Sequence, residues 1–301
     1  YPVSEGAGHF WAATPSGSQA IFEPKAGPDA ADLYLFDTAK AIAGEAPDSL
    51  IAEKTLGILG TSENLSKVYF LSEAQIEGQG EANQPNLYLY EAGEAPSVTY
   101  VATLSSLDAT ASSTAHLLSP VNERPDRHAA RLTPDGQTLA FMSSSAALAE
   151  QVAGYDNTDQ AAGRPDAEVY RYDAATAALV CVSCHRPGAR PQGRELEDSG
   201  LYAASRLAPW ETSLYAPRAL STDGTRIFFE SFEPLVLTDT NGRADVYEWE
   251  QEGAPGCAAS DPSLVPASGG CISLISSGKS PADSTFLDAS PGGRDAFVFR
   301  L

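Results

Sequence analysis

The stretch Leu132–Phe141, Leu-Thr-Pro-Asp-Gly-Gln-Thr-Leu-Ala-Phe, joins a tight-turn signal directly to an apolar strand. Asp followed by Gly is typical of a hairpin turn, and the apolar run after it has the content of a buried strand. A second copy, Leu-Ser-Thr-Asp-Gly-Thr-Arg-Ile-Phe-Phe, occupies residues 220–229. Related turns precede other short apolar runs, at Pro15-Ser16-Gly17, Ser62-Glu63-Asn64 and Pro291-Gly292-Gly293. The chain is therefore built from a repeat.

The turn at residues 62–64 lacks the glycine of the other copies. Asn tolerates the left-handed backbone conformation, so we predict that Asn64 preserves this turn.

A further strand recurs after four of these five hairpin strands. In four copies an aliphatic residue precedes a tyrosine, another aromatic residue follows two positions later, and acidic residues lie close by. Aromatic residues at i and i+2 share one face of a strand, which is typical of β-structure. The copies are Asp32-Leu-Tyr-Leu-Phe-Asp37, Asn86-Leu-Tyr-Leu-Tyr-Glu91, Glu168-Val-Tyr-Arg-Tyr-Asp173 and Asp245-Val-Tyr-Glu-Trp-Glu250.

Flanking apolar segments add a strand on each side of this pair, and four strands per unit are typical of a β-propeller blade. We predict an all-β chain, a β-propeller of four-stranded antiparallel blades, with four complete blades and part of another in one domain over residues 1–301. The expected blades span about 10–56, 57–104, 129–184 and 218–277, with a partial blade at 285–301; long crossover loops are expected at 105–128 and 185–217. A β-sandwich or a solenoid is the competing architecture.

The strings Leu132–Phe141 and Leu220–Phe229 resemble the repeat of TolB-like, WD40-like (PD40-type) propellers. The stretch Asp239–Tyr247 is similar to the loop and third strand of secreted bacterial versions. The resemblance covers most of residues 10–301 and weakens in the first two blades. It implies an interaction platform in the periplasm or at the cell surface, or an accessory propeller of a larger multidomain surface protein.

The net charge is −21, from 40 acidic and 19 basic residues. This charge argues against nucleic acid and against anionic membrane surfaces as partners. No apolar stretch is long enough to span a membrane, and no signal peptide is visible, so an upstream export signal is neither seen nor excluded. Four cysteines at short spacings favour two disulfides and an exported protein, in the periplasm, on the cell surface or outside the cell.

Strand order places the loops between second and third strands on the same face as the crossovers to the next blade. Long loops on a rigid scaffold are where binding usually occurs, so we expect a protein or glycan partner on this face. The crossovers are locally rich in basic and aromatic residues, which fit a pocket for an anionic or carbohydrate-like ligand with Trp210 as the stacking platform. The same residues could instead pin long loops to the sheet. The candidate ligand-binding residues are Trp210, Arg206, Tyr215, Arg127 and His128.

The loops between second and third strands are acidic, and oxygen ligands at alternate positions beside a glycine turn suit Ca²⁺. The candidate calcium ligands are Asp239, Asn241 and Asp245 in one loop and Asp156 and Asp159 in another. The alternative is that these side chains accept hydrogen bonds from nearby backbone N–H groups.

Cys257 and Cys271 flank a Gly/Pro/Ser-rich insertion, where we expect a disulfide. Cys181 and Cys184 precede His185, which gives the C-x-x-C-H pattern of covalent haem attachment. A second disulfide is the favoured interpretation, with a haem c or a zinc site as the alternatives.

No hydrolase elbow, zinc-protease helix or dinucleotide fingerprint is present. We therefore expect an exported binding scaffold rather than an enzyme; a redox or metal-bearing propeller that uses Cys181, Cys184 and His185 is the alternative. The favoured expectation is that no cofactor is bound; Ca²⁺ is the alternative that the acidic loops leave open, and haem c is disfavoured. The oligomeric state is left open.

Overall fold

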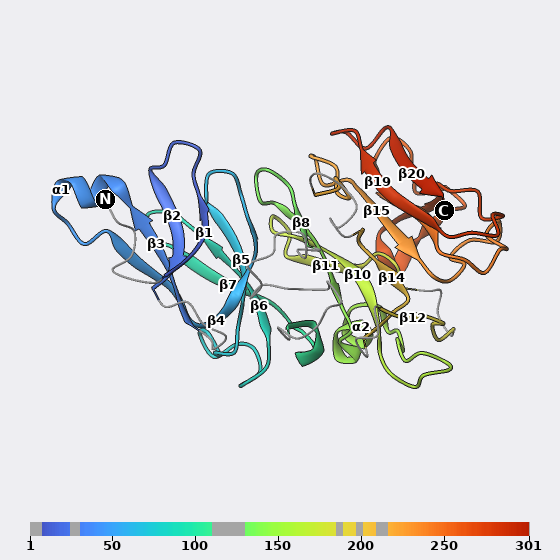
Figure 1. The fold of residues 1–301 in the computed structure, drawn as a ribbon, viewed down its shortest axis with the longest axis horizontal. Helices are drawn as coiled ribbons and strands as arrows, with labels where there is room; N and C mark the ends of the chain where they lie inside the picture. Colours follow the sequence, from blue (N-terminus) through green and yellow to red (C-terminus); the bar gives the residue numbers. More distant parts are fainter. Residues whose placement is uncertain are drawn as a thin grey trace.

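The structure is a computed structural model, and it describes residues 8–24, 31–109, 130–184, 189–196, 201–208 and 216–300. The strands form consecutive antiparallel sheets that follow one another along the long axis of the molecule (Figure 1). The N-terminal strands lie at one end of this axis and β19 and β20 at the other (Figure 1). Each complete sheet unit has the four strands of a propeller blade.

The first two blades share one strand and form a continuous sheet in the order β1 to β7. β4 is long enough to serve both blades, because its first half pairs with β3 and its second half pairs with β5. The helix α1 (Thr38–Ala43) follows β3 and is capped by the Asp37 side chain. The strands are β1 (His9–Ala13), β2 (Gln19–Glu23), β3 (Ala31–Asp37), β4 (Asp48–Thr61), β5 (Lys67–Ser72), β6 (Asn86–Glu91) and β7 (Ser97–Thr103).

The third blade contains β8 (Arg131–Leu132), β9 (Thr138–Ser143), β10 (Asp166–Asp173) and β11 (Ala178–Cys181). The 3-10 helix η1 (Ser106–Ala109) precedes this blade, and α2 (Ala146–Ala153) lies in the loop between β9 and β10. The fourth blade contains β14 (Ser205–Arg206), β15 (Arg226–Ser231), β16 (Asp245–Gln251) and β18 (Gly270–Leu274), with β17 (Leu264–Val265) and η3 (Pro266–Ser268) beside β18. The last unit is the hairpin of β19 (Ser284–Ala289) and β20 (Ala296–Arg300).

The interval between the third and fourth blades is not a plain loop. It contains β12 (Arg194–Glu195) and β13 (Tyr202–Ala203), and β13 pairs in parallel with the start of β10. β14 then pairs with the end of β15, whereas Leu220 pairs with its beginning. The first strand of the fourth blade therefore consists of two separate segments, β14 and the residues around Leu220. The sheet begins at Ser205, whereas residue 218 was expected.

The hairpin turn before every second strand is closed in the same way. A Ser or Thr hydroxyl accepts a hydrogen bond of 2.9–3.1 Å from the N–H five residues later. The same residue donates its own N–H to the carbonyl of that partner. The hydroxyl residues are Thr14, Ser62, Thr133, Ser221 and Ser290. The turn motif that repeats in the sequence thus forms the same hydrogen-bonded hairpin turn in all five places.

The prediction for Asn64 needs a correction. Asn64 Oδ1 accepts hydrogen bonds from Ser62 Oγ at 2.9 Å and from Ser66 N at 3.1 Å, as Asp135 Oδ1 does from Thr133 Oγ1 and Gln137 N. The left-handed residue of this turn is Leu65, with φ of 55°. Asn64 replaces the aspartate of the motif, and buried Leu65 replaces the glycine.

The turn glycines also connect successive blades. A Cβ atom on Gly136 would lie 2.8 Å from Cβ of Lys67, and one on Gly293 would lie 2.9 Å from Cδ of Arg226. A Cβ atom on Gly224 would likewise lie 2.8 Å from Cβ of Thr138. In each case the glycine of one blade covers the first residue of the second strand in the preceding blade. Only a residue without a side chain fits there.

The core repeats as well. In the four complete blades, a phenylalanine of the second strand faces a tyrosine of the third strand in the same register, and the ring centroids are 5.6–5.9 Å apart. The pairs are Phe22–Tyr34, Phe70–Tyr88, Phe141–Tyr170 and Phe229–Tyr247. Aromatic pairs at this distance stabilise a core beyond their buried area.

Candidate functional site

A pocket of 720 Å³ lies where the third and fourth blades meet. Three segments form its wall: residues 159–161 between β9 and β10, residues 189–194 of the crossover, and residues 232–234 between β15 and β16, with Gly242 at the edge. Both classes of long segment that strand order assigns to one face thus contribute to one cavity. Its volume lies in the range of small-ligand sites.

Asp159 shapes one side of the pocket. Its Oδ1 accepts hydrogen bonds from the N–H groups of Ala161 and Ala162, and its Oδ2 accepts one from Gly193 N at 2.9 Å. Asp166 Oδ2 shares the same Gly193 N–H at 3.0 Å. A side chain at Gly193 would collide with the Ala203 carbonyl and with Asp166. The crossover is therefore held tightly against two carboxyl groups.

These carboxyl groups belong to a buried acidic cluster at the start of β10. Burial, and next the charge of Asp159, raises the pKa of Asp166 to about 8, so Asp166 carries a proton at neutral pH. Burial, and next the charge of Glu233, also raises the pKa of Glu168 well above its usual value. Glu168 Oε2 accepts a hydrogen bond of 2.5 Å from Ser183 Oγ. The pKa values of Asp166 and Glu168 rise because burial disfavours the charged form of a carboxyl group.

Two arginines on the crossover line the pocket. Arg190 donates through Nε to the Thr158 carbonyl at 2.8 Å and lies 3.5 Å from Asp156. Arg194 donates to Asp283 Oδ2 at 2.9 Å, and its guanidinium lies 5.0 Å from the ring centroid of Phe232. Both side chains keep substantial exposure, 43% and 36%. The pocket is therefore lined by the guanidinium groups of Arg190 and Arg194, the Phe232 ring and the acidic residues Asp159 and Glu233.

Arg206 lies next to Phe232, one of the residues that line the pocket. Its guanidinium lies 5.5 Å from the Phe232 ring on β15's loop, and its Nε donates to Glu230 Oε2 at 2.7 Å. Glu230 is fully buried and also accepts the N–H of Phe286 in the next unit. Arg206 therefore neutralises a buried carboxylate, and its substitution is expected to lower stability. The other four predicted ligand-binding residues, Trp210, Tyr215, Arg127 and His128, lie outside the described residues.

The predicted calcium ligands lie in two loops and hold local hydrogen bonds. Asn241 Nδ2 donates to Asp245 Oδ2 at 2.6 Å, and Asp239 accepts the Tyr247 hydroxyl. Asp156 Oδ1 accepts the Thr158 N–H at 3.0 Å. Within the part of the chain that the structure describes, no three His, Cys, Asp or Glu residues are grouped as a metal site requires. Calcium at these loops stays a prediction.

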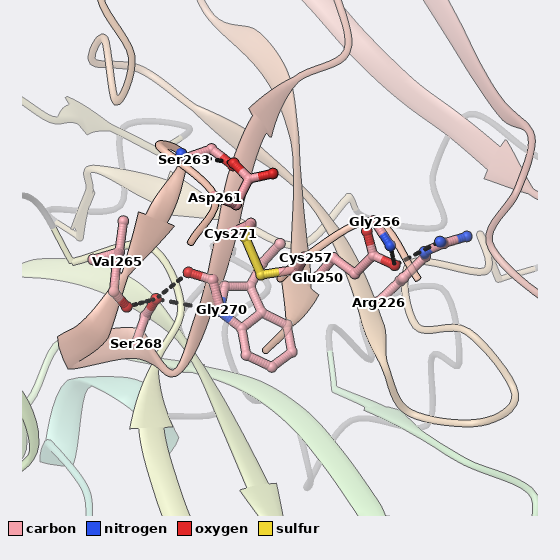
Figure 2. Close-up of a disulfide and its surroundings, with 11 residues drawn as sticks. Arg226, Glu250, Gly256, Cys257, Asp261, Ser263, Val265, Ser268, Gly270 and Cys271 are labelled. Carbon is pink, nitrogen blue, oxygen red and sulfur yellow. Dashed lines mark hydrogen bonds and ion pairs between the residues drawn. A yellow bond between two sulfur atoms is a disulfide. The ribbon is translucent and has the colours of Figure 1, made fainter. Parts of the chain in front are cut away.

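Both expected disulfides are present. Cys257 and Cys271 are joined, and so are Cys181 and Cys184, with Cα–Cα distances of 5.6 Å in each pair. Figure 2 shows the first bond beside Glu250, whose Oε1 accepts hydrogen bonds from Gly256 N at 3.0 Å and from Arg226 Nη2 at 2.6 Å. The bond thus closes the loop after β16 onto β18. Two disulfides are typical of an exported protein.

The Cys181–Cys184 bond has a consequence for the haem alternative. Both sulfur atoms are bonded to each other, whereas a covalently attached haem needs each of them for a thioether. His185, the axial ligand of that alternative, lies outside the described residues. Between the cysteines, Val182 N donates to the Val169 carbonyl and Ser183 Oγ accepts from Val169 N. The disulfide turn therefore anchors the start of β10 beneath the pocket.

Several pocket residues were missed by the sequence-based prediction: Gln160, Gln192, Gly193, Phe232, Glu233 and Pro234. One signal for them exists, because Phe232-Glu233-Pro234 follows a second strand directly and places an aromatic residue at the start of a loop. Asp159 was singled out, although as a calcium ligand.

The repeated four-stranded units and their order define a β-propeller. Solved propellers are similar to this chain at low identity: TolB from Acinetobacter baumannii is 14% identical over 92% of this chain and 57% of its own, with a TM-score of 0.31. The propeller domain of the Trilobed protease from Pyrococcus furiosus is 10% identical over 81% and 69%, with a TM-score of 0.32. Dipeptidyl peptidase 4 from Porphyromonas gingivalis is 12% identical over 95% and 32%, with a TM-score of 0.42.

The chain thus spans just over half the length of TolB and about a third of the dipeptidyl peptidase. These similarities concern the fold alone. No family model and no curated protein matches the sequence.

Within the described segments, no helix has the length and apolar character needed to cross a membrane.

Proposed function

We propose that this protein is an exported β-propeller that binds a protein or glycan partner through its loop-rich face. The observation that carries the proposal is the pocket at the junction of the third and fourth blades, because loops of both blades and the crossover converge on it. The two disulfides support export.

The chemistry of the wall supports a polar ligand. Arg194 and Phe232 offer a cation and a ring in one place, and Gln192 adds an amide. Planar guanidinium groups bind carboxylates and sugar hydroxyls through several N–H donors, and aromatic rings stack against apolar sugar faces. The segments behind them are fixed by the hydrogen bonds of Asp159, so the wall is preformed.

A defined array of oligosaccharides and peptides tests the proposal. We expect the wild-type protein to bind at least one class of probe, and Arg194→Glu to abolish that signal. Arg294→Glu is the matched control, because this exposed arginine lies on the tight turn before β20 and undergoes the same change of charge. An array without signal, or an equal loss in both variants, would contradict the proposal.

A further inference from the structure

The Cys181–Cys184 disulfide lies at the end of β11 and joins cysteines only 3 positions apart. Cys181 is 1% exposed and Cys184 is 8% exposed, so Cys184 is the more accessible of the two. The other disulfide lies deeper, because Cys257 is fully buried and Cys271 pairs with a strand on each of its sides. The two disulfides of this chain thus differ in access, and a reductant would reach Cys184 first.

The backbone stabilises the product that reduction would form. The N–H of Cys184 donates to Cys181 Sγ at 3.1 Å. A donor in this place stabilises a thiolate, because a hydrogen bond to the charged form favours that form. Two cysteines separated by two residues are also the arrangement found in disulfide oxidoreductases. Cys181 is therefore the better leaving group when a thiolate attacks Cys184.

The short loop between these cysteines limits what their bond contributes to folding. A disulfide stabilises mainly by restricting the unfolded chain, and it does so less when the loop that it closes is shorter. Cys181 and Cys184 are 3 positions apart, whereas Cys257 and Cys271 are 14 apart. The Cys181–Cys184 bond therefore contributes the smaller stabilisation, and we expect the third blade to stay folded without it.

The turn between the two cysteines is connected to the wall of the pocket. Ser183 Oγ donates to Glu168 Oε2 at 2.5 Å and accepts the Val169 N–H at 2.8 Å. Glu168 lies two residues after Asp166 on β10, so the two side chains share one face of the strand. Asp166 Oδ2 in turn accepts the N–H of Gly193, which lines the pocket. A turn that loosens on reduction would therefore weaken the hold of β10 on the crossover.

We propose that Cys181–Cys184 is a thiol–disulfide exchange site whose reduction loosens the crossover residues 189–194 in the pocket wall. A dithiol supplies the two electrons. One of its thiolates attacks Cys184 Sγ, the bond between the two cysteine sulfurs breaks, and Cys181 leaves as a thiolate that takes a proton from water. The second thiolate of the reductant then displaces Cys184, which also takes a proton. Both cysteines end as thiols, and the reductant ends as a disulfide.

Differential alkylation of the full chain tests the exchange step. The protein is incubated with graded dithiothreitol and trapped with iodoacetamide, and mass spectrometry quantifies each cysteine. We expect Cys181 and Cys184 to react together, about tenfold faster than Cys257 and Cys271, while the circular dichroism spectrum stays unchanged. Equal rates at the two disulfides, or unfolding on reduction of Cys181–Cys184, would overturn the proposal.

Hydrogen exchange at the Gln192 and Gly193 amides tests the connection to the pocket. Selective reduction should speed exchange at these amides by about tenfold, because it opens the local structure that protects them. Cys181→Ala with Cys184→Ala should reproduce the increase without reductant. Exchange that reduction leaves unchanged would contradict the proposal. It rests on the proposed function only in treating the cavity as a binding site, and neither measurement uses a ligand, so the two proposals can fail separately.

Two further variants separate this connection from a general loss of stability. Cys257→Ala with Cys271→Ala is the matched control, and it should leave exchange at the two crossover amides unchanged. Ser183→Ala should speed their exchange while the disulfide is intact, because it removes the hydroxyl group that joins the turn to Glu168. The proposal is also overturned if loss of the Cys257–Cys271 bond speeds exchange at these amides as much as loss of the Cys181–Cys184 bond.

Discussion

Replacing Gly224 by alanine should destabilise the protein more than replacing Gly17, although both glycines have nearly the same backbone conformation, with φ of 71° and 69°. The left-handed conformation alone costs alanine about 1–2 kcal/mol at either position. A Cβ atom at Gly17 would meet no heavy atom within 4 Å. At Gly224 it would overlap Thr138 in the preceding blade, which adds about 1–3 kcal/mol of overpacking. The difference between the variants therefore measures the contact between blades.

Urea denaturation followed by circular dichroism gives the free energy of unfolding of each variant. We expect a loss of about 1–2 kcal/mol for Gly17→Ala and about 2–5 kcal/mol for Gly224→Ala. Thr138→Ala should partly rescue Gly224→Ala in a double-mutant cycle, because it removes the nearest side-chain atom. Equal losses in the two glycine variants, or no coupling to Thr138, would refute the argument.

Two further predictions concern the disulfides and the buried acids. Cys257→Ser with Cys271→Ser should lower the free energy of unfolding by about 3 kcal/mol, since the bond joins residues 14 positions apart in the sequence, and urea titration measures the loss. The pKa of Asp166 is raised to about 8 in the folded state, so the folded chain retains a proton that the unfolded chain releases near pH 4. Its contribution to stability therefore falls as pH rises from about 4 to about 8 and is constant above that. Asp166→Asn should flatten this slope in urea titrations at pH 5 and pH 8, and an unchanged slope would show that Asp166 is not protonated.

The hairpins of the fold were predictable because their chemistry is local. An Asp-Gly turn and the apolar strand after it lie within ten residues, and the hydroxyl at Thr133 or Ser221 closes them without help from distant residues. Leu65 is the exception. Its left-handed backbone is compensated by complete burial of its side chain, and this burial depends on tertiary contacts that a turn motif does not encode.

The two short crossover strands, β13 beside the third blade and β14 at the start of the fourth, were not predictable for a related reason. β13 and β14 have two residues each, too few for any periodic pattern. They are extended because β10 and β15 provide hydrogen-bonding edges on either side. Arg131 reinforces the arrangement from the third blade, because its guanidinium donates to the carbonyls of Ala208 and Pro217 at 3.0 and 2.9 Å.

The candidate site was predictable as a face but not as a set of residues. Strand order determines which loops share a face, so the crossover and the loops beside it were the expected location. The individual residues depend on how the loops fold. Asp159 was expected to bind a cation, yet it accepts backbone N–H groups that nearby loops direct toward it. Arg206 was expected to contact a ligand, yet a buried carboxylate lies within reach of it.

The long strand β4 has a mechanical consequence. Because the single strand β4 closes the first blade and opens the second, the chain passes between these blades without a loop. Among the described residues, the later sheets share no strand of this kind with their neighbours. Native-state hydrogen exchange should therefore resolve the first two blades as a single cooperative unit, whose amides are released together, ahead of or after the rest of the chain. Under a pulling force, the same strand would transmit load through both blades at once, so this seven-stranded sheet would yield in one step.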